Sequence, residues 1–99
     1  MKMQEKFDWF IAKLEKEGYK LDYFNLVDGC GTYKYIGDNK TLQNSIVKTW
    51  EPKPKEWKYI RKVKIKFIVG DKEYKNISME KLISQIEFIK QYNEPSILI

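Results

Sequence analysis

The sequence contains no histidine, which is the side chain that most often acts as a general base in enzymes. Its absence excludes every Ser-His and Cys-His nucleophile arrangement and removes a common ligand of zinc. Catalysis would therefore have to depend on carboxylates, lysine or tyrosine. We predict a protein that is not an enzyme and that requires no metal or cofactor.

Cysteine and long apolar runs are also scarce. Cys30 is the only cysteine, so no disulfide can form within the chain, and a single thiol fits the reducing cytoplasm, which is the predicted location. No segment approaches the roughly 18 apolar residues of a membrane-spanning helix, and the charged start of the chain is unlike a signal peptide, so no membrane association is expected. We expect one domain over residues 1–94, followed by an apolar tail at residues 95–99.

The positive charge is concentrated in one segment. The net charge is +5, and residues 48–66 contain eight cationic and two anionic side chains, whereas the rest of the chain contains eleven cationic and twelve anionic ones. Arg61 is the only arginine. Abundant lysine, isoleucine, asparagine and tyrosine are typical of an AT-rich genome, which explains part of the lysine excess but not its concentration. The segment predicts a surface that binds an anionic partner.

Residues 57–77 predict a long β-hairpin with one lysine-bearing face. Apolar residues alternate with lysines over residues 63–69, which is the period expected of a strand with one face on a core and the other in water. Gly70 opens a two-residue turn, because glycine tolerates the positive φ that such turns require. This turn would place Lys66 opposite Lys75 on the neighbouring strand.

Apolar residues at helical spacing predict two amphipathic helices, one over residues 2–17 and one that begins at Ser78. Gly18 is expected to end the first helix and Pro95 the second. Trp9 lies off the apolar stripe of the first helix. It is therefore either covered by another element or exposed as a contact residue.

Between the helices, β-forming residues predict strands over residues 19–27 and 32–36. Residues 41–48 favour a short helix, with a strand over residues 46–50 as the alternative. The alternating prolines of residues 51–56 predict an irregular, exposed connector. We expect an α+β two-layer sandwich, in which both helices pack on one face of a four-stranded antiparallel sheet in the order α-β-β-(α)-β-β-α.

The predicted partner-binding surface combines strand and loop residues of the basic segment with one residue of the next strand. Its members are Lys53, Lys55, Trp57, Lys58, Lys62, Lys64, Lys66 and Lys75. Lysines on a solvent-facing strand also occur simply because they oppose aggregation, and aromatic side chains are more often part of a core. The binding role of this surface is therefore a hypothesis that rests on the concentration of charge.

Two kinds of partner fit this surface. Our main prediction is a small inhibitor or adaptor of the kind found in phages and mobile elements, which binds a protein partner such as a nucleic-acid-processing complex. The alternative is a nucleic-acid-binding protein without sequence specificity. A lysine contacts phosphate as a point charge, whereas the bidentate reading of bases favours arginine.

An enzymatic alternative rests on two Glu-x-Lys sequences, Glu56-Trp57-Lys58 and Glu73-Tyr74-Lys75. Each matches half of the metal-binding core of a magnesium-dependent nuclease. Such a core also needs an aspartate on a preceding strand, for which Asp22 is the candidate. Because Glu-x-Lys arises by chance in a chain rich in both residues, the prediction of a non-catalytic protein is retained.

Overall fold

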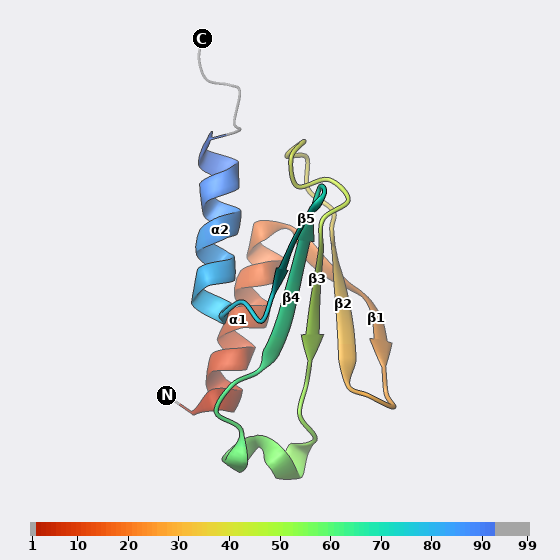
Figure 1. Ribbon diagram of the computed structural model, residues 1–99, viewed down its shortest axis with the longest axis vertical. Helices are drawn as coiled ribbons and strands as arrows, with labels where there is room; N and C mark the ends of the chain where they lie inside the picture. Colours follow the sequence, from red (N-terminus) through yellow and green to blue (C-terminus); the bar gives the residue numbers. More distant parts are fainter. Residues whose placement is uncertain (1, 93–99) are drawn as a thin grey trace.

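The computed structural model describes residues 2–92 and shows an α+β fold in two layers (Figure 1). The helices α1 (Met3–Glu17) and α2 (Met79–Tyr92) lie on the same side of a five-stranded antiparallel sheet. The strands, in the order of both the chain and the sheet, are β1 (Tyr19–Asn25), β2 (Cys30–Tyr35), β3 (Ile46–Trp50), β4 (Lys64–Val69) and β5 (Lys72–Lys75). The predicted two-layer α+β sandwich is thus confirmed. The expected tail at residues 95–99, with the stop at Pro95, lies outside the described residues.

Helix α1 forms because an apolar stripe is flanked by suitable ends. The backbone N–H of Lys2 donates to Oε1 of Glu5 at 2.9 Å, which satisfies a free donor at the start of the helix. At the other end Gly18 adopts the left-handed conformation, with φ at 108°, as expected of a residue that ends a helix. Trp9 is half-buried and packs against the core, so another part of the protein covers it in part.

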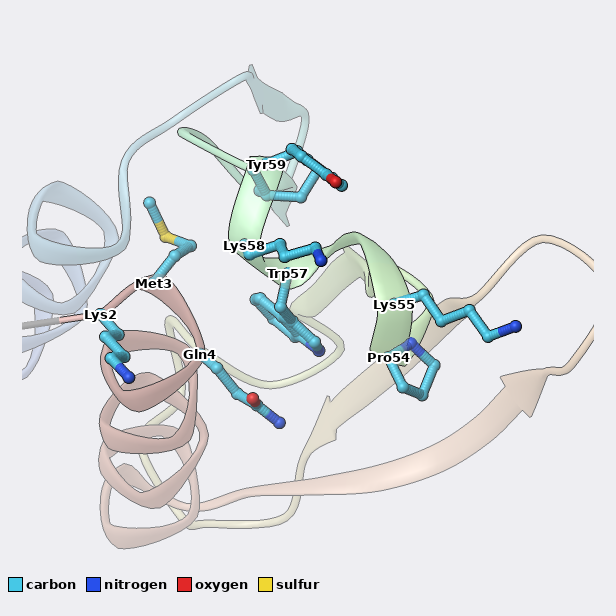
Figure 2. Close-up of a pocket in the computed structure, with 9 residues that line it drawn as sticks. Lys2, Met3, Gln4, Pro54, Lys55, Trp57, Lys58 and Tyr59 are labelled. Carbon is cyan, nitrogen blue, oxygen red and sulfur yellow. The ribbon is translucent and has the colours of Figure 1, made fainter.

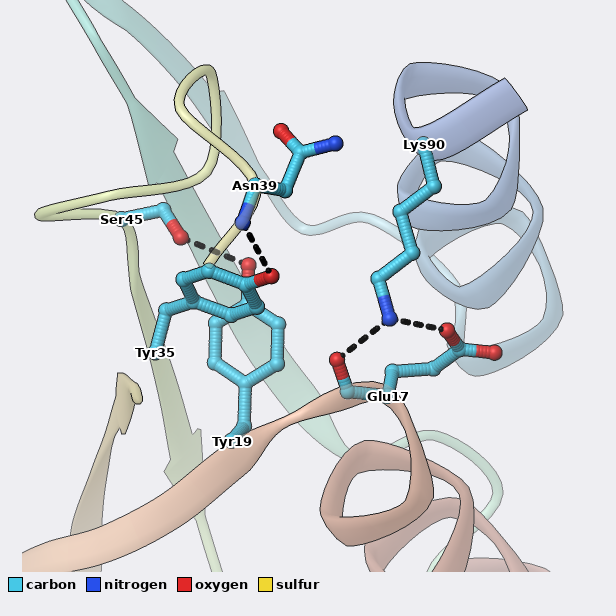
Figure 3. A network of polar contacts seen from close by, with 6 residues as sticks. All are labelled: Glu17, Tyr19, Tyr35, Asn39, Ser45 and Lys90. Carbon is cyan, nitrogen blue, oxygen red and sulfur yellow. Dashed lines mark hydrogen bonds and ion pairs between the residues drawn. The ribbon is translucent and has the colours of Figure 1, made fainter. Parts of the chain in front are cut away.

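Helix α2 begins as predicted, because the hydroxyl of Ser78 accepts a hydrogen bond from the N–H of Lys81 at 3.2 Å. Its predicted core stripe is buried throughout and consists of Met79, Leu82, Ile83, Ile86 and Ile89. The two helices are joined at their ends by ion pairs. Lys90 reaches Oε1 of Glu17 at 2.8 Å (Figure 3).

The sheet turns alternate residues toward the helices. One buried row crosses its centre, where Tyr33 pairs with Val47 and Val47 with Phe67. At the edge next to α1, the hydroxyl of Tyr19 lies 2.6 Å from Oγ of Ser45 and both side chains are buried (Figure 3). Burial raises the pKa of Tyr19 well above its ordinary value, so this hydroxyl stays neutral and can share a hydrogen bond with the serine.

The predicted helix over residues 41–48 is wrong, and the alternative strand over residues 46–50 is correct. Residues 40–44 form turns, and Asn44 at the end of this stretch has a positive φ of 68°. The following segment is rich in β-branched and aromatic residues, and it pairs with both β2 and β4. Pairing with a strand on each side outweighs a weak local preference for helix, so the sheet has five strands rather than four.

The hairpin is shorter than predicted. Its turn and register are correct, since Lys66 pairs with Lys75, but β4 begins only at Lys64. Residues 54–59 form a short 3₁₀ helix, η1 (Pro54–Tyr59), so neither the predicted strand from residue 57 nor the fully irregular connector is correct. Pro54 fixes the first turn, and the N–H of Lys53 donates to Oε1 of Glu56 at 3.1 Å.

The turn between β1 and β2 is docked on the start of the connector that leads to η1. The N–H of Glu51 donates to the carbonyl of Gly29 at 2.8 Å. Gly29 has a φ of 73°, and a Cβ at this position would lie 2.5 Å from the carbonyl oxygen of Glu51, so only glycine fits without strain. The predicted strand over residues 19–27 ends early, at Asn25, and the turn exposes Leu26 and Val27.

Candidate binding surfaces

The two helices cover one face of the sheet (Figure 1), and the strand registers place six lysines on the other face. Strand alternation places them there, because successive side chains of a strand point to opposite faces and the neighbours of Lys48, Lys64 and Lys66 include buried core residues. We call this surface the lysine face, and its lysines are Lys20, Lys34, Lys48, Lys64, Lys66 and Lys75. No helix of residues 2–92 covers it.

Three lysines form a row across the lysine face. Lys48 pairs directly with Lys66, and Lys66 pairs with Lys75 on the next strand. Neighbouring strands are about 4.8 Å apart, and like charges directly opposite one another destabilise a sheet. The fold therefore tolerates an unfavourable arrangement from β3 to the edge strand β5.

Glu73 is the counterion of this row. Its carboxylate lies 3.3 Å from Nζ of Lys66 and 3.5 Å from Nζ of Lys75. The hydrogen bond from Lys66, helped by the charges of both lysines, lowers the pKa of Glu73 below its ordinary value. Within residues 2–92, Lys48 has no ion pair, so Glu73 neutralises only part of the row.

Two aromatic side chains accompany the lysines. Trp50 lies on the same face as Lys64, whose Nζ is 5.0 Å from the centroid of its indole ring, a cation–π distance. Beside them is a hollow of about 300 Å³ that also involves Lys66 and Lys75. A register irregularity after Leu21 turns Tyr23 to this face, where it is 61% exposed. The lysine face thus offers charge together with two ring surfaces.

A second surface is a groove of about 850 Å³ between the start of α1 and η1 (Figure 2). We call it the η1 groove. Its floor contains Trp57, whose ring packs on the buried Phe7 with 5.5 Å between the ring centroids. The residues that line it are Lys2, Met3, Gln4, Pro54, Lys55, Trp57, Lys58, Tyr59 and Ile60.

The η1 groove is cationic around an apolar floor. Lys2 comes from the α1 side, whereas Lys55 and Lys58 come from η1 (Figure 2). None of the residues that line the groove is acidic. Nζ of Lys58 lies 5.2 Å from the ring centroid of Tyr59, which is 73% exposed. The groove therefore combines rigid aromatic area with positive charge.

The eight predicted site residues do not form one surface. Those on the lysine face are Lys64, Lys66 and Lys75. Those in the η1 groove are Lys55, Trp57 and Lys58. The other two, Lys53 and Lys62, are exposed on either side of η1. Their roles in binding stay predictions, but the structure assigns them to different parts of the molecule.

Three lysines of the lysine face were not among the predicted site residues: Lys20, Lys34 and Lys48. Lys20 and Lys34 are far from the basic segment in sequence and join it only because β1 and β2 complete the sheet. Lys48 lay in a stretch predicted as helix. The alternation of Ile46, Lys48 and Trp50 with buried Val47 and Thr49 was the signal that could have placed it.

The carboxylates proposed for a nuclease core are not brought together. Asp22 belongs to β1 and Glu73 to β5, which are the opposite edges of the sheet. Four strand spacings separate them, about 19 Å, whereas one magnesium ion binds its ligands at about 2.1 Å. Across residues 2–92 no group of three acidic or cysteine side chains could hold a metal ion. The structure therefore does not bring Asp22 and Glu73 together as the nuclease alternative requires.

Comparisons of the chain with models of protein families, with curated proteins and with solved structures found no match. None of the helices within residues 2–92 is long and apolar enough to span a bilayer. The function must therefore be argued from the lysine face and the η1 groove.

Proposed function

We propose that this chain is a non-catalytic nucleic-acid-binding protein that contacts phosphates through the lysine face without reading base sequence. The observation that carries the proposal is the row of Lys48, Lys66 and Lys75, which stand side by side on three neighbouring strands. Their mutual repulsion destabilises the free protein. A partner with regularly repeated negative charges relieves this repulsion, and a phosphate backbone is such a partner.

The chemistry of the side chains supports backbone contact rather than base readout. The lysine face contains no arginine, and a lysine ammonium binds phosphate as a point charge. Bidentate contacts to guanine, the most common specific contact, favour arginine. Tyr23 and Trp50 add ring surfaces on which unpaired bases can stack irrespective of their sequence. We therefore expect single-stranded DNA or RNA to bind with little sequence preference.

The lysine face suits a protein partner less well. The cores of protein interfaces are depleted in lysine and enriched in tryptophan, tyrosine and arginine. The two aromatic residues of the lysine face stand among six lysines, whereas Trp57 and Tyr59 share the η1 groove with the apolar Ile60. The main sequence-based prediction, an inhibitor or adaptor that binds a protein, is therefore better supported at the groove.

The test reverses the charge of the row. The variant K48E/K66E/K75E is titrated against labelled single-stranded DNA and RNA by fluorescence anisotropy, beside K16E/K40E/K81E. The residues changed in the control variant are exposed and lie outside both surfaces. Both variants replace three lysines by glutamate, so their net charges change equally. We expect the row variant to lose at least about 100-fold in affinity, because three contacts of about 1 kcal/mol each are lost, and the control to lose less than about tenfold.

Circular dichroism and thermal unfolding check that both variants remain folded. Equal losses in the two variants would show that only the net charge matters. Failure of the parent protein to bind either nucleic acid at low salt would refute the proposed function.

A further inference from the structure

We infer that the η1 groove is a docking site for an acidic peptide segment of a partner protein, with an apolar side chain of that segment as its anchor. This inference goes beyond the proposed function, because it concerns another surface and another class of ligand. It also assigns a role to the groove residues Lys55, Trp57 and Lys58, which the lysine face does not include.

The volume and floor of the groove suit an inserted side chain. A volume of about 850 Å³ lies within the usual range of ligand pockets, roughly 300–1,000 Å³. The ring of Trp57 is held against Phe7, and both Trp57 and Ile60 pack against the core of the protein. Because this apolar floor is already fixed, ligand binding would not include the entropic cost of ordering it.

The charge of the groove selects an anionic occupant. Lys2 and Lys58 stand on its two sides, and Lys55 lies further along η1 (Figure 2). The nearby carboxylates of Glu5 and Glu56 accept hydrogen bonds from the backbone at the starts of α1 and η1, respectively. They cap their own helices and keep their negative charge, but neither of them is among the residues that line the groove.

A peptide fits this arrangement better than a nucleic acid. On the lysine face the cations continue across the strands, as a phosphate backbone requires, whereas the few lysines that line the groove lie beside a single apolar floor. Tryptophan and tyrosine in a partly enclosed site are the residues that most often dominate binding between proteins. Tyr59 is available for such a contact, since most of its side chain is exposed.

The position of the groove leaves the lysine face free. The groove borders α1, which packs on one side of the sheet, and the lysine face is the opposite side (Figures 1 and 2). An acidic peptide and a nucleic acid can therefore be bound at the same time. Such a protein would act as an adaptor between a nucleic acid and a second protein.

The probe is a pool of synthetic peptides of about 12 residues, in which Asp and Glu flank a central position occupied equally by Phe, Leu, Ile or Trp. One control pool has serine at the centre, and another replaces every acidic residue by its amide. Binding is followed by ¹H–¹⁵N NMR, with the indole resonance of Trp57 assigned from Trp57→Phe. We expect shifts at Trp57 and at residues 2–4 and 54–60, and no shifts on β3 and β4.

Charge reversal identifies the groove as the site. K55E/K58E should weaken binding of the acidic pool at least about tenfold, since two attractions become repulsions, while K16E/K81E should change it less than about threefold. Both control pools should bind more weakly than the probe. Absence of shifts at Trp57 up to about 1 mM peptide would overturn the inference, as would displacement of the peptides by single-stranded DNA in the variant K48E/K66E/K75E. Neither result depends on whether the lysine face binds nucleic acid.

Discussion

The lysine face and the η1 groove draw on the same basic segment but differ in what lies between their cations. On the lysine face, lysine stands beside lysine on neighbouring strands, and Glu73 is the counterion of the row. In the groove, the lysines line the same hollow as the ring of Trp57, which packs on Phe7. A concentration of charge in a sequence therefore does not define one surface. Its chemistry depends on whether the fold places charge or apolar area next to each lysine.

The two surfaces should respond differently to salt. Affinity for a phosphate backbone arises largely from the release of condensed counterions, so it falls linearly in a plot of log affinity against log salt. Binding at the η1 groove should fall less steeply with salt, because salt screens its contacts between lysines and acidic residues but does not weaken the burial of its apolar anchor. The salt dependence of binding therefore distinguishes the two surfaces.

The largest expected effect is a crossed loss of binding. K48E/K66E/K75E should lose at least about 100-fold in affinity for single-stranded DNA and change less than about threefold toward the acidic peptide pool. K55E/K58E should show the reverse pattern, because its substitutions lie in the groove. Each ligand is titrated against each variant under identical conditions. If both variants lose affinity for both ligands, the two surfaces act as one site rather than as two.

The next largest expected effect is on the stability of the protein, and it concerns the floor of the η1 groove. Trp57→Ala should lower the free energy of unfolding by about 2 kcal/mol, because it removes half-buried aromatic area packed on Phe7. Urea denaturation of the variant and of the parent measures this difference. Tyr59→Ala is the matched control, since its ring is mostly exposed, and it should cost less than about 0.5 kcal/mol. Equal costs would mean that Trp57 is not the fixed floor of the groove.

A smaller change in the free energy of unfolding, in this case an increase, is expected from a substitution on the lysine face. Lys48→Thr removes a charge opposite Lys66 and introduces a β-branched residue into a central strand. It should raise the free energy of unfolding by about 0.5 kcal/mol and yet reduce the salt slope of single-stranded nucleic-acid binding by about 0.7. Urea denaturation and titrations at several salt concentrations test the two parts. A stabilised variant with an unchanged slope would show that Lys48 makes no phosphate contact.

The parts of the fold that were predicted correctly are those with strong local periodicity. The buried stripe of α2 and its cap at Ser78 follow from spacing and side-chain chemistry alone. The register of β4 and β5 follows from the glycine turn. The strand over residues 46–50 was only an alternative, because its alternation covers just five residues and its pairing with β2 and β4, which decides its conformation, is a tertiary property.

The candidate site was harder to predict than the fold. Lys58 was expected on the same face as Lys64, because the strand period was extended backward past residue 64. In the structure η1 carries Lys58 to the groove, and β4 begins at Lys64. Lys20 and Lys34 reach the lysine face only through the order of strands in the sheet. Charge along the chain located the basic segment, but its division into two surfaces is a tertiary property.

The smallest expected effect concerns Glu73, which stabilises the row of lysines and at the same time opposes an anionic ligand. Glu73→Gln should increase affinity for single-stranded DNA about twofold to fivefold at pH 7, because one negative charge leaves the surface. The same change should slightly lower stability, since Lys66 and Lys75 then repel without a counterion. Anisotropy titrations and urea denaturation give the two numbers. Glu87→Gln, an exposed carboxylate on α2, is the control and should change neither.

The pH dependence of stability and DNA affinity in the parent protein, compared with Glu73→Gln, gives a second test. The pKa of Glu73 is lowered in the folded protein, chiefly by the hydrogen bond from Lys66, so its stabilising contribution is present above the unfolded pKa and is lost as the pH falls through the folded pKa. Over the same range the protonated carboxyl stops opposing the ligand, so DNA affinity of the parent should rise until it equals that of Glu73→Gln. A lysine face that only resists aggregation would show the loss of stability without the gain in affinity. Opposite changes in stability and affinity would show that the row is arranged for an anionic ligand.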